Sequence, residues 1–375
     1  MSSTTIPVKV QTRLWGKAAG RCQYEGCNKP LWYDSTTKSE FNSSYIAHIV
    51  ADRPNGPRGD EVRSKQLSKE ISNLMLMCDV HHRLIDRHDV EGHPEDVLVA
   101  MKKKQEEKVE MLTSLTEDKQ SHVILYGANI GQNKSNVSME KAIHAMLPKR
   151  YPADNRAIEL SLSGSLFKDN EDVYWTIERE NLKRQFSEKI GPRLQNEIKH
   201  ISVFALAPMP LLIEFGRLLS DIQEADVFQL HREPTDWVWK ENPENFEYRI
   251  YNPEKIFKTV ALNISLSGTI DNSRIRDVLG NDVSVWTITI DTPYNDFLKS
   301  KEQLKKFREE FRKLMNKIKE THGHKNELHL FPAAPVSVAL EIGRTWMPKA
   351  DLPLKIYDEN RKNNGFTHTF DIKHY

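Results

Sequence analysis

All three cysteines of the chain lie within its first 78 residues, where they form two pairs of potential metal ligands together with a histidine. Four residues separate Cys22 from Cys27, and two separate Cys78 from His81. Structural zinc is bound tetrahedrally by four cysteine or histidine side chains that come in such closely spaced pairs. The spacing therefore predicts one structural zinc ion, which would contribute on the order of 10 kcal/mol to the folding of a small lobe.

Two further histidines lie beside this predicted zinc site. His48 stands in the apolar segment Tyr45–Val50, which has the composition of a strand, and His82 follows directly after His81 at the start of a predicted helix. An imidazole that titrates near neutral pH suits the activation of water. Asp86 comes one helical turn after His82, so the two side chains should share a helix face and be able to hold a divalent ion.

This combination resembles the HNH endonucleases. That family has paired cysteine ligands, a His-Ile pair in a strand, an Asn-Leu pair five residues before a cysteine and a histidine directly after the last zinc ligand, and the chain matches it at His48, Asn73 and His82. The resemblance implies a ββα-metal module over roughly residues 18–88 that cleaves double-stranded DNA. It implies that His48 activates water, that Asn73 orients the His48 loop or contacts the metal, and that His82 with Asp86 holds Mg²⁺ or another divalent ion beside the leaving oxygen.

One position departs from the HNH pattern. Many members carry an acidic metal ligand directly before the first histidine, where this chain has Ala47. The loop that follows, residues 52–60, is rich in turn-forming residues and is expected to be exposed. Its two arginines, Arg53 and Arg58, are predicted to contact DNA phosphates, with plain solvation as the alternative.

The rest of the chain contains an internal repeat. Five short segments recur in the same order: 160–164 as 264–268 (LSLSG, ISLSG), 175–177 as 286–288 (WTI), 204–208 as 331–335 (FALAP, FPAAP), 214–217 as 341–344 (EFGR, EIGR) and 225–226 as 350–351 (AD). Strand–helix–strand patterning predicts two copies of a Rossmann-like α/β unit, with the SLSG and WTI segments as paired strands. The second copy should carry a long helix over about residues 297–320.

An HNH module followed by this duplicated unit resembles the HNH–SAVED effector nucleases of bacterial CBASS antiphage defence. The resemblance implies a sensor of two fused CARF-like units that binds a cyclic di- or trinucleotide made by a partner cyclic-nucleotide synthase. It also implies that ligand binding drives assembly, to a homodimer or a ligand-induced homotetramer, and switches on DNA cleavage in an abortive-infection response.

Such a sensor needs donors for phosphates and flat surfaces for bases. The ends of the SLSG segments are predicted to approach phosphates, namely Ser163, Gly164, Ser267 and Gly268. Two helix-entry loops are predicted at Pro208, Met209, Pro210 and Pro335. Three aromatic residues are predicted to stack on bases: Trp237, Trp239 and Tyr294. Trp175 and Trp286 are expected in the core, and the E-x-G-R segments are expected to pack helices together.

The 375 residues therefore predict an α/β protein with an HNH module (1–95) that carries structural zinc, a connecting helix (96–120) and a CARF-like, SAVED sensor (121–375, with repeats of about 121–250 and 251–375). A net charge of +1 means that any DNA-binding surface must be local. Without a signal-peptide core or a membrane-length apolar run, a cytoplasmic protein is expected. A restriction-type HNH nuclease without small-molecule gating and a zinc-dependent DNA-binding regulator without cleavage are the alternatives.

Overall fold

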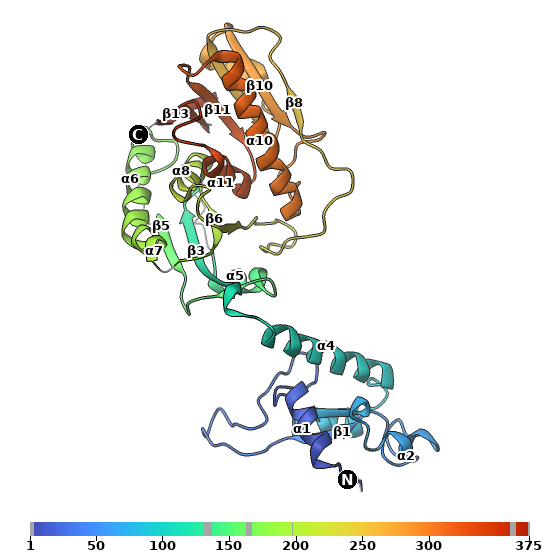
Figure 1. Cartoon of the computed structure of the whole chain (residues 1–375). Coiled ribbons are helices and arrows are strands. Elements are labelled where there is room, and N and C mark those ends of the chain that lie inside the picture. Colours follow the sequence, from blue (N-terminus) through green and yellow to red (C-terminus); the bar gives the residue numbers. More distant parts are fainter. Residues whose placement is uncertain (1–3, 131–136, 163–166, 197, 361–364, 374–375) are drawn as a thin grey trace. The chain divides into compact units, whose positions relative to one another are not determined.

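The computed structural model (Figure 1) describes residues 4–130, 137–162, 167–196, 198–360 and 365–373. The chain divides into two compact units, Met1–Thr116 and Glu117–Tyr375. Among the helices in these ranges, none is both long enough and apolar enough to cross a membrane.

The first unit is organised around a two-stranded antiparallel hairpin. Strands β1 (Tyr45–His48) and β2 (Leu74–Met77) pair so that His48 lies opposite Leu74. All four residues of β2 are buried, which makes this strand the centre of the small core. The helices of the unit are α1 (Val8–Lys17), α2 (Arg63–Leu67), the 3-10 turn η1 (Ile71–Asn73), α3 (Asp79–Arg83), the π-helical turn η2 (Leu84–His88) and α4 (Glu95–Thr113). The order β1, β2, α3 is the predicted ββα arrangement.

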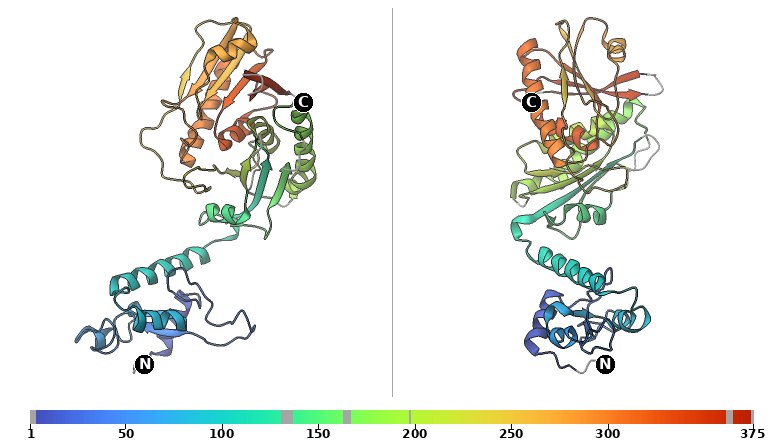
Figure 2. Two further views of the ribbon diagram at one scale, coloured as in Figure 1. Left: turned by 180° about the vertical axis from the view of Figure 1, so that it is seen from behind. Right: turned by 90° about the vertical axis from the view of Figure 1, so that its right-hand side faces the viewer.

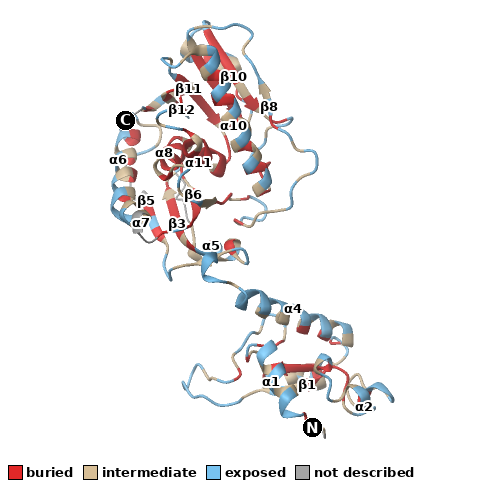
Figure 3. Cartoon of the chain, in the orientation of Figure 1, coloured by how far each residue is buried: buried red, intermediate tan, exposed pale blue. Residues whose placement is uncertain are grey.

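The predicted connecting helix is α4, and it belongs to the first unit. Leu98 and Lys102, four residues apart, are its buried residues. Most of the remaining surface of α4 is exposed or partly exposed, as Figure 3 shows. Helix α4 is therefore held against the unit by one narrow face.

The second unit begins with a parallel sheet in the order β5-β3-β6-β7, with β4 beside the start of β3. Its strands are β3 (Gln120–Ala128), β4 (Tyr151–Pro152), β5 (Ile158–Leu162), β6 (Ile201–Leu206) and β7 (Ala225–Val227). Its helices are α5 (Met139–Met146), α6 (Asp172–Lys189), α7 (Gly191–Asn196) and α8 (Met209–Leu219). Figure 2 shows these elements from two further sides.

A second sheet follows in the order β13-β12-β11-β9-β10-β8. Its strands are β8 (Arg249–Tyr251), β9 (Thr259–Ser265), β10 (Val283–Thr289), β11 (Leu328–Ala333), β12 (Leu354–Asn360) and β13 (Gly365–Ile372), and its helices are α9 (Asn272–Leu279), α10 (Lys301–His322) and α11 (Val336–Thr345). The four inner strands are parallel, and β8 and β13 add antiparallel edges. Since β10-β9-β11-β12 repeats β5-β3-β6-β7 with helices in matching places, the predicted duplication of a Rossmann-like unit is confirmed.

Only some of the five sequence matches occupy equivalent places in the two copies. The FALAP and FPAAP segments both lead from a strand into the next helix, β6 to α8 and β11 to α11. The prediction of paired WTI strands is wrong, because residues 175–177 lie in helix α6 whereas residues 286–288 lie in β10. The SLSG segments also differ, since one follows the outer strand β5 and the other follows the central strand β9. A buried segment of three or four residues does not by itself distinguish helix from strand.

The E-x-G-R segments pack helices together, as predicted, and the two helices belong to different copies. Helices α8 and α11 approach so closely that a Cβ atom on Gly216 would lie 1.9 Å from the Leu340 carbonyl oxygen, and one on Gly343 would lie 1.9 Å from that of Ile213. The acidic residue of each segment is buried between two arginines: Glu214 contacts Arg179 and Arg217, and Glu341 contacts Arg308 and Arg344. The copies are thus related by matching contacts across the α8–α11 interface.

The predicted long helix is α10, which begins at Lys301 rather than near residue 297. Ser300 caps it by accepting the Gln303 backbone N–H, and the Gln303 side chain accepts the Ser300 N–H in return. Its inner face buries the expected apolar stripe: Leu304, Phe307, Phe311, Leu314, Met315 and Ile318. The capping box explains why the helix starts after the apolar pair at 297–298 and not within it.

Candidate functional site

The structure brings the four predicted zinc ligands together in the first unit. Their ligand atoms, the sulfurs of Cys22, Cys27 and Cys78 and the Nδ1 atom of His81, all lie within 4.8 Å of one another. His81 Nδ1 is 3.2 Å from Cys78 Sγ and 3.7 Å from Cys22 Sγ. Ligands of a tetrahedral zinc ion are expected roughly 3.5–3.8 Å apart, given Zn–S and Zn–N bonds of about 2.3 and 2.0 Å. The donor set and its spacing therefore fit zinc.

The surroundings of this cluster favour a bound cation. Burial, together with the nearby Cys78 and Cys27, raises the pKa of the Cys22 thiol to about 12. The thiolates that bind zinc thus require a compensating positive charge at this place. The Tyr24 ring stacks on the His81 imidazole at a centroid distance of 4.0 Å and holds its orientation.

The cluster is tied to helix α4 and to strand β2 by Gln23, a buried residue between the two cysteines of the first ligand pair. Its side-chain amide donates to Gln105 (3.1 Å) and Glu106 (3.2 Å) of α4. Its side-chain oxygen accepts the backbone N–H of Leu76 in β2 at 2.8 Å. One side chain therefore joins the loop of the first ligand pair, the central strand and the last helix of the unit.

His48 lies at the end of β1 and is nearly buried. Its Nε2 atom is 2.9 Å from the carbonyl oxygen of Ser68. Because a carbonyl only accepts, Nε2 carries the proton of a neutral ring and Nδ1 is the basic nitrogen. Asn73 holds Val50, two residues after His48, through both of its backbone groups: its side chain accepts the Val50 N–H and donates to the Val50 carbonyl, each at 2.8 Å. Both bonds go to the segment after His48, which is the segment that the orienting role predicted for Asn73 concerns; the alternative role, a metal contact, stays a prediction.

His82 and Asp86 face each other across one helical turn, with Nε2 and Oδ2 3.3 Å apart. The other carboxylate oxygen of Asp86 accepts from Arg58 at 2.8 Å. Burial acts to raise the pKa of Asp86, but the hydrogen bonds and charges of His82 and Arg58 outweigh it and lower that pKa. Asp86 is therefore held ionised beside an imidazole, a pair of donors that suits a divalent ion retaining several water ligands.

The role predicted for Arg58, contact with DNA phosphates, is corrected by the structure. Its guanidinium is buried and donates to the carbonyls of Ile49 (2.6 Å) and Ile85 (2.7 Å) as well as to Asp86. These bonds connect the segment after β1 to the π-helical turn, so Arg58 positions Asp86. The composition of the loop does not predict the burial of Arg58, because a turn-rich, mostly exposed segment can still contain one buried arginine. Arg53, the other predicted DNA contact, lies in the same loop.

Sequence reasoning missed Tyr45, the first residue of β1. Its ring stacks on the His82 imidazole at a centroid distance of 4.9 Å and an interplanar angle of 14°. The ring remains 43% exposed. A tyrosine at the start of a strand carries no sequence signal for such a contact, which depends on the pairing of β1 with β2.

In the second unit, the predicted helix-entry loops meet. Pro208 and Pro335 are the N-cap residues of α8 and α11, and the sulfur of Met209 accepts the N–H of Ala334 at 3.3 Å. Pro210 is buried in the first turn of α8. Since proline has no N–H, Pro208 and Pro210 remove two backbone donors from the start of α8, and Pro335 removes one from the start of α11.

The other predicted ligand residues that the structure describes lie in different settings. Ser163 and Gly164 lie outside the described residues. Ser267 donates its N–H to the Ala333 carbonyl at 2.8 Å, so this donor is already used, whereas a Cβ atom on Gly268 would meet open space. Tyr294 is 50% exposed.

Trp237 does not fit the predicted stacking role, because it is 2% exposed and packs edge-on against Phe204. Trp239 is partly buried against the same core. Trp175 and Trp286 are core residues, as predicted. Because Trp237 and Trp239 lie between predicted strands, the sequence predicts that they are loop residues, although their segment packs back onto the sheet.

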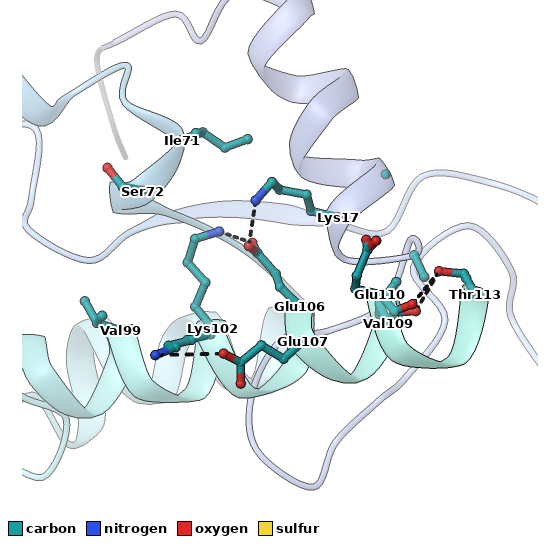
Figure 4. Close-up of a pocket in the computed structure, with 13 residues that line it drawn as sticks. Lys17, Ile71, Ser72, Val99, Lys102, Glu106, Glu107, Val109, Glu110 and Thr113 are labelled. Carbon is teal, nitrogen blue, oxygen red and sulfur yellow. Dashed lines mark hydrogen bonds and ion pairs between the residues drawn. The ribbon is translucent and has the colours of Figure 1, made fainter. Parts of the chain in front are cut away.

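A cavity of about 670 Å³ lies in the first unit between the end of α1, η1 and α4 (Figure 4). Three lysines and three glutamates line it, and all three lysines are paired with glutamates of the same wall. Lys17 and Lys102 contact Glu106, and Lys103 contacts Glu107. The walls therefore present balanced ion pairs rather than a charge that would select an ion.

Comparisons with known proteins place the second unit in a family. The family described as "SMODS-associated and fused to various effectors sensor domain" (SAVED) matches residues 182–372, slightly more than half of the chain. No curated protein sequence matches the chain.

Solved structures similar to the chain include three of the Acinetobacter baumannii Cap4 SAVED/CARF-domain containing receptor. With the cyclic trinucleotide 2'3'3'-cAAA the TM-score is 0.43 and the identity 13%, over 74% of this chain and 60% of that chain. With 3'3'3'-cAAA the values are 0.42 and 14%, over 74% and 59%. The receptor alone gives 0.42 and 13%, over 76% and 60%. This chain thus spans less than two thirds of the length of these receptors. From the family match over residues 182–372, the chain belongs to the SAVED sensor-domain family.

Proposed function

We propose that the chain is a metal-dependent DNA endonuclease whose activity is switched on by a cyclic oligonucleotide, and that it acts as an antiphage effector. One observation carries the proposal: the chain contains both a SAVED sensor and a separate compact unit. SAVED domains are described as fused to various effectors, and the separate unit has a zinc-type ligand cluster and a His82–Asp86 pair. In this proposal the second unit is the sensor. The first unit is the effector.

His48 is the general base in this proposal. The Ser68 carbonyl fixes the proton of the neutral ring on Nε2, which leaves Nδ1 to take a proton from the attacking water. Asn73 keeps the segment after His48 in place through its paired bonds to Val50. The orientation of the base is thereby set before DNA binds.

His82 and Asp86 would hold the catalytic divalent ion, which when bound stabilises charge on the phosphate and the leaving oxygen. Arg58 keeps Asp86 ionised and fixes its position, and Tyr45 fixes the plane of the His82 ring. The four-ligand cluster would hold structural zinc and keep α3 at the end of β2. With Ala47 before the first histidine, the pair His82–Asp86 supplies the side-chain ligands.

The sensor role follows from the family of the second unit. A ligand that binds between or beside the two copies can favour an active assembly only through a higher affinity for that assembly. A shift from 1:99 to 99:1 requires about 5.5 kcal/mol of differential binding. The Cap4 receptors were solved with cyclic trinucleotides, so 2'3'3'-cAAA and 3'3'3'-cAAA are among the first ligands to test.

The test incubates the purified full chain with supercoiled plasmid and Mg²⁺, with and without a panel of cyclic di- and trinucleotides. Cleavage that requires one of the nucleotides is expected. His48→Ala should abolish cleavage, whereas His88→Ala, a matched control at the exposed end of η2, should retain it. Cleavage that ignores every nucleotide would support an ungated nuclease, and nucleotide binding without cleavage would refute the nuclease role.

A further inference from the structure

A short antiparallel ribbon in the first unit carries aromatic side chains on its outer face. Tyr33 pairs with Glu40 in an isolated bridge, and the N–H of Phe41 donates to the Trp32 carbonyl at 3.2 Å. Trp32 and Phe41 are therefore cross-strand neighbours on one face. Leu31 points to the other face, into the core, where it is fully buried.

This outer face is both exposed and ordered by its contacts. Trp32 is 46% exposed and Phe41 is 54% exposed. One edge of the Trp32 ring lies over Gly20, at a place where a Cβ atom would come within 2.9 Å of it. The turn that closes the ribbon is held by Asp34, whose carboxylate accepts the N–H groups of Thr36 and Thr37. The two rings are thus presented by a fixed scaffold.

The aromatic face lies close along the chain to the proposed catalytic residues. Tyr45, four residues after Phe41, stacks on His82. Four extended residues span at most about 14 Å, which is the rise of roughly four base pairs of DNA. Phe41 therefore lies within that distance of Tyr45, the residue that stacks on the proposed metal ligand His82.

We propose that Trp32 and Phe41 form a DNA-contacting surface that packs against bases and sugars next to the cleavage site. The inference rests on the proposed function, because it takes DNA as the substrate. Exposed, rigid aromatic side chains favour contact with the apolar parts of a partner, and in DNA-binding proteins such side chains wedge against or between base steps. Lys29 and Lys38 are exposed in the same segment, which also carries the acidic Asp34 and Glu40, so any phosphate contact there is local to the two lysines.

The test measures the affinity of the full chain for a labelled duplex across a range of salt concentrations, in Ca²⁺ and with the activating nucleotide. The double variant W32A/F41A should bind at least about five-fold more weakly, the lower end of the effect of removing a base-stacking aromatic. Its slope of log affinity against log salt should stay unchanged, since no phosphate contact is lost. Lys38→Ala should instead reduce the slope. Ile222→Ala, an exposed apolar residue of the sensor unit, is the matched control.

Phe41→Ala alone guards against misfolding, because Phe41 is the more exposed of the two rings. Zinc content and the circular dichroism spectrum of each variant report on the fold. Wild-type affinity in W32A/F41A and in Phe41→Ala overturns the inference and leaves the proposed nuclease intact. A changed oligomeric state with unchanged DNA affinity also overturns it, in favour of a protein contact. No DNA binding by the unaltered chain refutes the proposed function itself.

Discussion

Replacing either glycine of the α8–α11 interface by alanine should destabilise the sensor unit. A Cβ atom on Gly216 would lie 1.9 Å from the Leu340 carbonyl oxygen, whereas carbon and carbonyl oxygen are in contact at about 3.3 Å. The helices would have to separate by roughly 1.4 Å, a cost near the upper end of the ~1–3 kcal/mol typical of overpacking because the colliding atom belongs to the backbone. Alanine recovers about 1 kcal/mol of helix propensity, so a net loss of about 2 kcal/mol is expected.

Gly343→Ala should cost a similar amount, because its Cβ atom would meet the Ile213 carbonyl oxygen at the same 1.9 Å. A single separation of the helices relieves both collisions, so the double variant should cost clearly less than the sum of the single variants.

Thermal unfolding followed by tryptophan fluorescence should show the sensor transition about 4–8 °C lower for each single variant. Gly268→Ala, whose added Cβ atom meets nothing within 4 Å, is the control. An unchanged transition in Gly216→Ala, or full additivity in the double variant, would refute this description of the interface.

Three further predictions concern the metal site, the ionised acid and a buried acid. Cys27→Ser or a chelator should remove zinc and unfold the first unit while the sensor transition stays, which calorimetry with metal analysis checks; two unchanged transitions would contradict the site. Arg58→Met should raise the pKa of Asp86, so the acid limb of the cleavage–pH profile should move to higher pH; an unmoved limb would exclude the positioning role. Burial, then Asp169, raises the pKa of Asp358 to about 7. Between about pH 4 and 7 the folded state then holds this proton and the unfolded state does not. The contribution of Asp358 to the free energy of unfolding should therefore fall by up to about 1.4 kcal/mol for each pH unit of increase. Asp358→Asn should remove that slope in denaturant titrations.

The sequence predicts those features that depend on residue type and local spacing. Cysteine and histidine pairs indicate the metal cluster, and the FALAP and FPAAP segments locate equivalent strand–helix junctions in the two copies. The sequence does not predict features that depend on tertiary contacts. Arg58 has the composition of a solvated loop residue and is nevertheless buried against Asp86. Trp175 and Trp286 share a tripeptide, yet one lies in a helix and the other in a strand, because neighbouring elements decide the conformation of so short a segment. Tyr45 reaches His82 only through strand pairing.

Gln23 connects the loop of the first ligand pair to two other elements of the first unit. Its amide bonds to Gln105 and Glu106 attach the loop to α4, after which the chain continues into the sensor, and its oxygen holds the backbone of β2. A zinc ion that orders this loop would also set where α4 is fastened to the β1–β2 hairpin. Under the proposed function, the metal content would then govern communication as well as folding: a zinc-depleted chain would keep the proposed nucleotide site of the second unit, but helix α4 would have lost its hold on the loop and strand beside the proposed catalytic residues.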